Sequence, residues 1–121
     1  MLGVHDGRLA ACPAKPNCVS SQATGRWRVA PLAFSGLASL ALVRLKKILS
    51  SLPRTRIVEE SDGYLRAEVS SRIFGFVDDV EFFVDESTAL VHVRSASRVG
   101  YWDFGVNRAR VEMIRARFEV R

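Results

Sequence analysis

Residues 55–97 read TRIVEESDGYLRAEVSSRIFGFVDDVEFFVDESTALVHVRSAS, and this stretch decides the fold. Apolar and polar side chains alternate along it with a period of two, which is the pattern of half-buried β-strands. Turn-forming residues interrupt the alternation at 61–63, near 74–75 and at 85–88. The stretch therefore predicts four consecutive antiparallel strands, near residues 55–60, 64–71, 76–84 and 89–97.

Helical spacing flanks these strands. Apolar residues recur every three or four positions over 35–52 and again over 106–119, which predicts one helix on each side. Ser35 is the expected N-cap of the first helix, and Pro53 follows its end. A short edge strand is expected around Trp27. The predicted order is β-α-β-β-β-β-α, an α+β domain in which two helices pack on one face of an antiparallel meander sheet of four to five strands.

The start of the chain has a different composition. Residues 1–25 contain many turn formers without a periodic apolar pattern, so we expect an N-terminal cysteine-containing loop packed on a single α+β domain of residues 26–121. Cys12 and Cys18 can form a disulfide in this loop or remain reduced, and the sequence leaves both states open. No second cysteine or histidine pair completes a zinc site, so we expect no metal.

Charge is segregated along the chain, although the net charge is only +5. Residues 1–56 hold nine basic residues and one acidic residue, 57–93 hold two and nine, and 94–121 hold seven and three. The acidic middle would repel phosphate, and no aromatic residues are interleaved with the arginines, which argues against nucleic acid as a partner.

The same sequence bears on location. No apolar segment approaches the roughly 20 residues that a membrane helix needs, so no membrane span is expected. Residues 1–8 lack the basic and apolar regions of a secretory signal. We therefore expect a cytoplasmic location for the chain as written, and an envelope location if a leader or anchor has been removed.

The alternation also assigns strand residues to faces of the sheet. The face under the helices is expected to carry Leu65, Ala67, Val69, Val80, Phe82, Val84, Val91 and Val93. The opposite face carries Glu68, Asp79, Glu81, His92 and Arg94. These side chains predict either cross-strand ion pairs on a solvated face or an organised polar site.

A second group of polar residues follows along the last strand and beyond it: Ser95, Ser97, Arg98, Asp103, Asn107 and Arg108. Arg98 and Arg108 could receive a small anion or the carboxylate of a partner. Asp103 and Asn107 could instead cap the last helix. Asp78 should point towards the core, where an arginine such as Arg98 or Arg108 is its expected partner.

Several segments together resemble one known family. They are Cys12-Pro13, Pro16-Asn17-Cys18-Val19-Ser20-Ser21, the run from Gly75 to Phe82, Arg94 to Gly100, and Asp103 to Arg108. In this order and spacing they resemble the bacterial and plastid-lineage proteins grouped as domain of unknown function 1499, over nearly the whole chain. The resemblance implies a fold and a candidate surface, and it brings no assigned activity or catalytic residues.

These observations favour a non-enzymatic binding module that recognises a small anion or a partner carboxylate through the arginine-rich polar cluster. One alternative is a hydrolytic or metal-assisted enzyme that uses Glu81, Asp79 and His92 as base or ligands. Another is a purely structural polar network, with function at a protein interface. The expected partner is thus a small anion or a protein. No motif predicts a cofactor or an oligomeric state.

Overall fold

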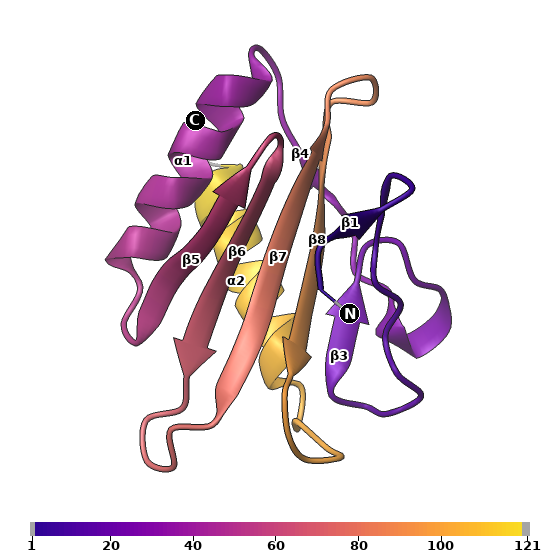
Figure 1. The fold of residues 1–121 in the computed structure, drawn as a ribbon, viewed down its shortest axis with the longest axis vertical. Coiled ribbons are helices and arrows are strands. Elements are labelled where there is room, and N and C mark those ends of the chain that lie inside the picture. Colours follow the sequence, from indigo (N-terminus) through magenta and orange to yellow (C-terminus); the bar gives the residue numbers. More distant parts are fainter. Residues whose placement is uncertain (1, 120–121) are drawn as a thin grey trace.

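A computed structural model describes residues 2–119 of the chain (Figure 1). Its main element is a six-stranded antiparallel sheet, larger than the four to five strands expected. The strands are β3 (Cys18–Ser20), β4 (Leu32–Ala33), β5 (Thr55–Ser61), β6 (Tyr64–Ser70), β7 (Val77–Asp85) and β8 (Leu90–Ser97). They lie in the order β3-β8-β7-β6-β5, and β4 also pairs with β8.

The predicted meander is confirmed. Each of β5 to β8 begins and ends within one residue of its expected position, because alternation and turn residues mark a long strand clearly. Glu81 on β7 lies opposite Arg66 on β6 and Arg94 on β8, so acidic and basic side chains face each other across neighbouring strands.

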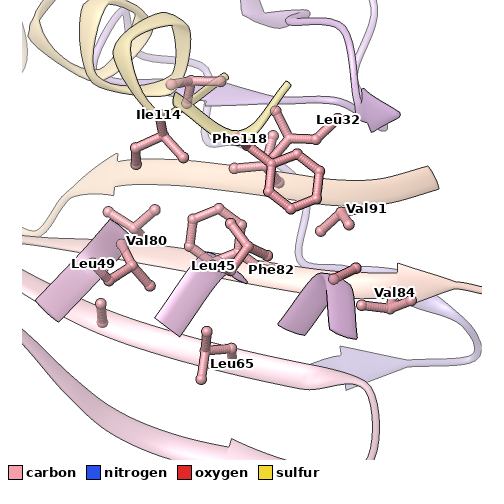
Figure 2. Packing of buried hydrophobic residues seen from close by; sticks show 14 of the residues in the cluster. Leu32, Leu45, Leu49, Leu65, Val80, Phe82, Val84, Val91, Ile114 and Phe118 are labelled. Atoms are coloured by element: carbon pink, nitrogen blue, oxygen red, sulfur yellow. The ribbon is translucent and has the colours of Figure 1, made fainter. Parts of the chain in front are cut away.

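Two helices, α1 (Ala38–Ser51) and α2 (Val106–Phe118), cover one face of the sheet, which confirms the α+β class. Figure 2 shows Leu45 and Leu49 of α1 and Phe118 of α2 packed around Phe82 of the sheet. All four side chains are almost fully buried. Since burying one such side chain contributes about 1.5–3 kcal/mol, this layer supplies most of the driving force for folding.

The start of α1 was predicted wrongly. Leu37 occupies the N-cap without a side-chain hydrogen bond, and Ser35 lies outside the helix. Gly36 explains the difference, because its φ of 82° turns the chain between Ser35 and the first helical residue.

The first 33 residues contain more regular structure than expected. β1 (Val4–His5) and β2 (Arg8–Leu9) form a small hairpin, and β3 joins the main sheet instead of lying in a loop. The expected strand around Trp27 is a short 3₁₀ helix, η1 (Gly25–Trp27), because Gly25 turns the chain with a φ of 63°.

The N-terminal segment, defined here as residues 2–12, lies against the outer face of the sheet, which is the face away from the helices. The Gly3 N–H donates to Glu81 at 2.7 Å, and Arg94 Nη2 donates to the Ala11 carbonyl at 3.3 Å. The N-terminal segment therefore covers part of the polar outer face of the sheet. Within residues 2–119, no helix is long and apolar enough to cross a membrane.

Candidate functional site

Four charged side chains on the outer face form one ion network, which we call the outer-face network: Arg66, Glu68, Asp79 and Arg98. Arg98 holds Asp79 with two hydrogen bonds, Nε to Oδ2 at 2.8 Å and Nη2 to Oδ1 at 2.9 Å. The same Nη2 lies 2.6 Å from Glu68 Oε2, and Arg66 Nη1 lies 3.0 Å from Asp79 Oδ1. Paired, parallel contacts of this kind are the strong form of a carboxylate–guanidinium interaction.

The network determines the charge state of its acids. Burial raises the pKa of Asp79, but the hydrogen bonds and charges of Arg98 and Arg66 outweigh burial and hold that pKa below its usual range. Hydrogen bonds from Arg98 and Arg56 likewise lower the pKa of Glu68. Both acids are therefore ionised at neutral pH, and arginines already neutralise their charge. Neither acid is suited to carry a proton in catalysis.

A second outer-face cluster, Tyr64, Glu81 and Arg94, lies buried beneath the N-terminal segment. The Glu81 side chain has no solvent exposure, and Tyr64 donates its hydroxyl hydrogen to Glu81 Oε2 at 2.6 Å. Arg94 Nη1 lies 3.5 Å from Glu81 Oε1. Burial and the neighbouring Glu81 carboxylate raise the pKa of Tyr64. This part of the face is thus not the solvated surface that cross-strand pairing alone would give.

His92 has a separate environment. Its Nδ1 lies 3.0 Å from Ser21 Oγ, and burial lowers the pKa of the imidazole. His92 lies opposite Phe83 in the register, whereas Glu81 lies opposite Arg94 and Asp79 opposite Ala96. Glu81, Asp79 and His92, which the enzyme alternative requires to act together, therefore lie in three different cross-strand pairs. Each of them has its own hydrogen-bond partners.

Asn107 lies at the centre of a third group, on the helix side of the sheet, where it is fully buried. Its Oδ1 accepts from Ser95 Oγ and Arg110 Nη1, both at 2.7 Å. Its Nδ2 contacts Ser97 Oγ at 3.0 Å, Asp103 Oδ2 at 2.8 Å and the Asn17 carbonyl at 3.2 Å. We call these residues the Asn107 network.

Asp103 acts at the start of α2. Its carboxylate accepts the N–H of Gly105 at 2.8 Å and that of Asn107 at 3.3 Å, so it satisfies free donors of the first helical turn. Gly105 itself occupies the N-cap, with a φ of 80°.

The expected partner of Asp78 was wrong. Asp78 does point to the helix side, but Arg110 Nη2 binds it at 2.8 Å. Arg108 instead donates to the carbonyls of Arg26 at 2.6 Å and Arg28 at 2.9 Å, which joins α2 to η1. Residues two apart on a helix point about 200° apart, so Arg108 and Arg110 reach different neighbours. The register gave no indication of Arg110, which lies three residues after Asn107 on the same side of α2.

The ten candidate residues therefore do not converge. Glu68, Asp79 and Arg98 belong to the outer-face network, Glu81 and Arg94 lie beneath the N-terminal segment, and Arg108 contacts backbone near η1. The remaining four are Ser95, Ser97, Asp103 and Asn107, in the Asn107 network.

A different surface concentrates exposed side chains. It comprises two loops, 71–76 and 98–105, and the first residue of α2, all at the same end of the sheet (Figure 1). Eight large apolar residues on them are at least half exposed, and we call this set the aromatic end: Ile73, Phe74, Phe76, Val99, Tyr101, Trp102, Phe104 and Val106. Alternation did not reveal this surface, because the residues lie outside the strands.

Both loops are anchored at their roots. The Ser71 N–H donates to the Phe76 carbonyl at 2.7 Å, which closes the first loop. Asn17 Nδ2 donates to the Gly100 carbonyl at 2.7 Å, and the Asp103 N–H donates to the Pro16 carbonyl at 3.3 Å. The exposed rings thus project from a base that is tied to both the sheet and the cysteine loop.

The cysteine loop is closed by a disulfide between Cys12 and Cys18. A cavity of about 280 Å³ beside it is lined by residues that include Arg8, Cys12 and Trp27. Within residues 2–119, no group of three or more His, Cys, Asp or Glu side chains is placed to hold a metal ion.

Residues 8–118 match a family model described as "Protein of unknown function (DUF1499)". No curated protein matches the chain. Three of the segments that carry the family resemblance meet in the structure, since Asn17 bonds both to Gly100 and to Asn107.

Proposed function

The chain belongs to the DUF1499 family, whose description assigns no activity, and we therefore propose a function from the geometry: the protein is a non-enzymatic binding module that contacts its partner through the aromatic end. The observation that carries the proposal is the gathering of eight exposed apolar side chains on two loops and the start of α2, at one end of the sheet. Contiguous exposed apolar surface is uncommon on proteins that act alone and is typical of interaction sites.

The arrangement of the polar residues supports this proposal. Every charged member of the outer-face network already has an opposite charge beside it, and the Asn107 network joins a strand, a helix and a loop. These contacts hold the base of the loop 98–105 in place, and the hydrogen bond from Ser71 to Phe76 closes the loop 71–76. The polar residues then serve as scaffold, and recognition falls to the side chains that the scaffold presents.

Site-specific photo-crosslinking in cells tests the proposal without assuming the class of partner. p-Benzoylphenylalanine is placed at Phe104, at Phe74 or at the control position Leu40, which is exposed near the start of α1, at the opposite end of the sheet (Figure 1). We expect adducts with one partner, lipid or protein, from positions 104 and 74 and none from position 40. Equal adducts from all three positions, or none from the loops, would contradict the proposal.

A second candidate function is recognition of a small anion or a partner carboxylate at Arg98. It is favoured by the exposure of that side chain, which remains 43% accessible although two acids hold it in place. Titration with acetate and with inorganic phosphate, followed by NMR of the arginine side chains, should shift Arg98 before other arginines. Arg98→Lys should lose the effect, and Arg56→Ala, which removes a single contact to Glu68, should keep it. No selective shift at Arg98 would exclude this candidate.

The disulfide supports an envelope or other oxidising compartment as part of this proposal, in place of the cytoplasm expected from residues 1–8. Trapping of free thiols in intact cells, followed by mass spectrometry, should find Cys12 and Cys18 protected. Two alkylated cysteines would place the protein in a reducing compartment.

A further inference from the structure

We propose that the partner of the aromatic end is the surface of an anionic lipid bilayer. This inference rests on the proposed function and names its partner. Four observations support it: the types of side chain, their shape on the surface, the charge around them and the backbone at Phe104.

The side chains are those that lie well at a membrane–water interface. Five of the protein's 11 aromatic residues lie on these two loops: Phe74, Phe76, Tyr101, Trp102 and Phe104. Tryptophan and tyrosine are favoured at the headgroup level, because a large apolar ring carries one polar N–H or O–H that stays in water. Phenylalanine and isoleucine, which lack that polar group, suit the acyl boundary just below.

The aromatic end protrudes. Phe104 is 87% exposed and Ile73 is 82% exposed, and each ring pair, Phe74 with Phe76 and Trp102 with Phe104, lies within one loop. A folded protein partner would need a groove shaped to these irregular tips. Fluid acyl chains close around irregular tips without such a groove, so a bilayer fits this surface better.

Charge at this end is positive where it is exposed. Arg72 lies within the first loop, Arg54 exchanges two hydrogen bonds with Ser70 at its root, and Arg26 shares a hollow with Trp102. The acids nearby are occupied: Asp78 binds Arg110, Asp79 binds Arg98, and Asp103 accepts hydrogen bonds from Gly105 and Asn107. Exposed basic residues such as these three, beside apolar tips, attract anionic headgroups.

The opposite end of the sheet carries the opposite sign. The β5–β6 turn contains Asp62, Asp85 ends β7, and Glu86 begins the turn that follows it (Figure 1). The negative charge of these turns therefore lies away from the aromatic end. A negatively charged surface would orient the molecule with the aromatic end inwards and the acidic turns outwards.

The backbone at Phe104 supports a role for its ring outside the protein. Phe104 has a φ of 54°, in the left-handed region that is costly for a residue with a side chain. Burial does not offset that cost, because the ring is mostly in water. Strained, exposed residues of this kind are characteristic of functional surfaces.

Vesicle co-sedimentation of the full chain tests the proposal. The probes are vesicles of phosphatidylcholine alone and vesicles of phosphatidylcholine and phosphatidylglycerol in equal parts. We expect strong binding to the anionic vesicles, little binding to the neutral ones, and release by high salt. Tryptophan emission should shift to the blue on binding, and the shift should be absent from Trp102→Phe, which retains Trp27.

Variants locate the contact. Trp102→Ser/Phe104→Ser should weaken binding by about tenfold or more, because two rings no longer enter the interface. Arg72→Glu, on the other loop, should weaken binding to the anionic vesicles without any change to the apolar tips. The matched control is Leu37→Ser/Leu40→Ser, which removes two comparably exposed side chains from α1. It should bind like wild type, and all four proteins should have the same melting temperature.

The outcomes separate this inference from the proposed function. No vesicle binding, together with a protein adduct at position 104 in the cross-linking experiment, would overturn the bilayer and leave the binding module standing. No vesicle binding and no adduct would overturn both. Equal binding to neutral and anionic vesicles, or loss of binding in the α1 control alone, would also overturn this inference.

Discussion

At the scale of single residues, Asn107 joins three parts of the chain through one amide. Its side chain contacts Ser95 and Ser97 on β8, Asp103 before α2, and the backbone of Asn17 in the cysteine loop. An amide suits this position, because it offers an acceptor and two donors within one small planar group. The side chain therefore fixes how α2 and the cysteine loop meet β8.

We expect Asn107→Ala to lower the free energy of unfolding by about 3 kcal/mol, because several buried donors and acceptors lose their partner at once. Urea unfolding followed by circular dichroism measures the change. Arg117→Ala, on the exposed side of the same helix, is the control and should change stability by less than about 0.5 kcal/mol. A loss as small as that of the control would contradict the central role of Asn107.

Asp79 makes the free energy of unfolding depend on pH. We expect Asp79→Asn to cost about 2 kcal/mol at neutral pH, because the variant loses the charged contacts to Arg98 and Arg66. The folded pKa of Asp79 lies below its unfolded value of about 3.9, so its contribution is present above that value and declines as pH falls through the folded pKa. The difference between wild type and variant should therefore shrink in acid.

Urea midpoints measured at neutral and at acid pH check this expectation. Asp62→Asn, in an exposed turn, should follow the wild-type acid dependence. A difference between Asp79→Asn and wild type that stays constant with pH would show that the ionised carboxylate is not what stabilises the network.

Alternation predicted which face each strand residue occupies, because the pleat fixes side-chain direction once a strand exists. It placed Glu81 and Arg94 on the outer face correctly, and it could not show that both are buried. Their burial comes from Gly3 and Ala11, far away in the sequence, and no local pattern encodes such a contact. The aromatic end was missed for a related reason, since loop residues have no periodicity to interpret.

At the scale of elements, length separates what was predicted from what was not. Strands β5 to β8 have seven to nine residues each, enough for a period of two to be recognised. Strands β3 and β4 have three and two residues, and they exist because β8 offers an unpaired edge to the segments beside it. Tertiary pairing determines such short strands, so the sheet proved larger than the sequence indicated.

The disulfide stabilises the cysteine loop, at the end of which β3 begins. Cys12 and Cys18 are six residues apart in the sequence. Closing a loop of this size lowers the conformational entropy of the unfolded chain, which stabilises the folded state by about 2 kcal/mol. We expect dithiothreitol to lower the free energy of unfolding of the wild type by about that amount in urea titrations. Cys12→Ser should start at the lower value and show no response to dithiothreitol. An equal response in both proteins would mean that the reductant acts elsewhere.

At the scale of the whole molecule, we expect the protection of backbone amides from hydrogen exchange to decline from the middle of the sheet to its edges. Strand β7 is paired on both edges, and Val80 and Phe82 within it are fully buried. β8 is likewise paired on both sides, whereas β5 is an edge strand with mostly exposed residues.

Native-state hydrogen exchange measures this gradient. We expect the slowest amide exchange in β7 and β8, intermediate rates in β5, and the fastest rates in the loops 71–76 and 98–105. Exchange in β5 as slow as that in β7 would mean that the sheet opens only as a unit. Slow exchange in the two loops would contradict their exposure to solvent.

The pairing of the chain's beginning with its end governs when the protein can finish folding during synthesis. Asn17 accepts a hydrogen bond from a residue 90 positions later, and Gly3 donates one to a residue 78 positions later. On the ribosome the cysteine loop therefore emerges first and cannot form its native contacts until the end of the chain is made. The meander can fold as it emerges, because its contacts join neighbouring strands. A nascent chain that stalls before α2 would expose the apolar face of its sheet to solvent, and it would depend on chaperones until the last helix is made.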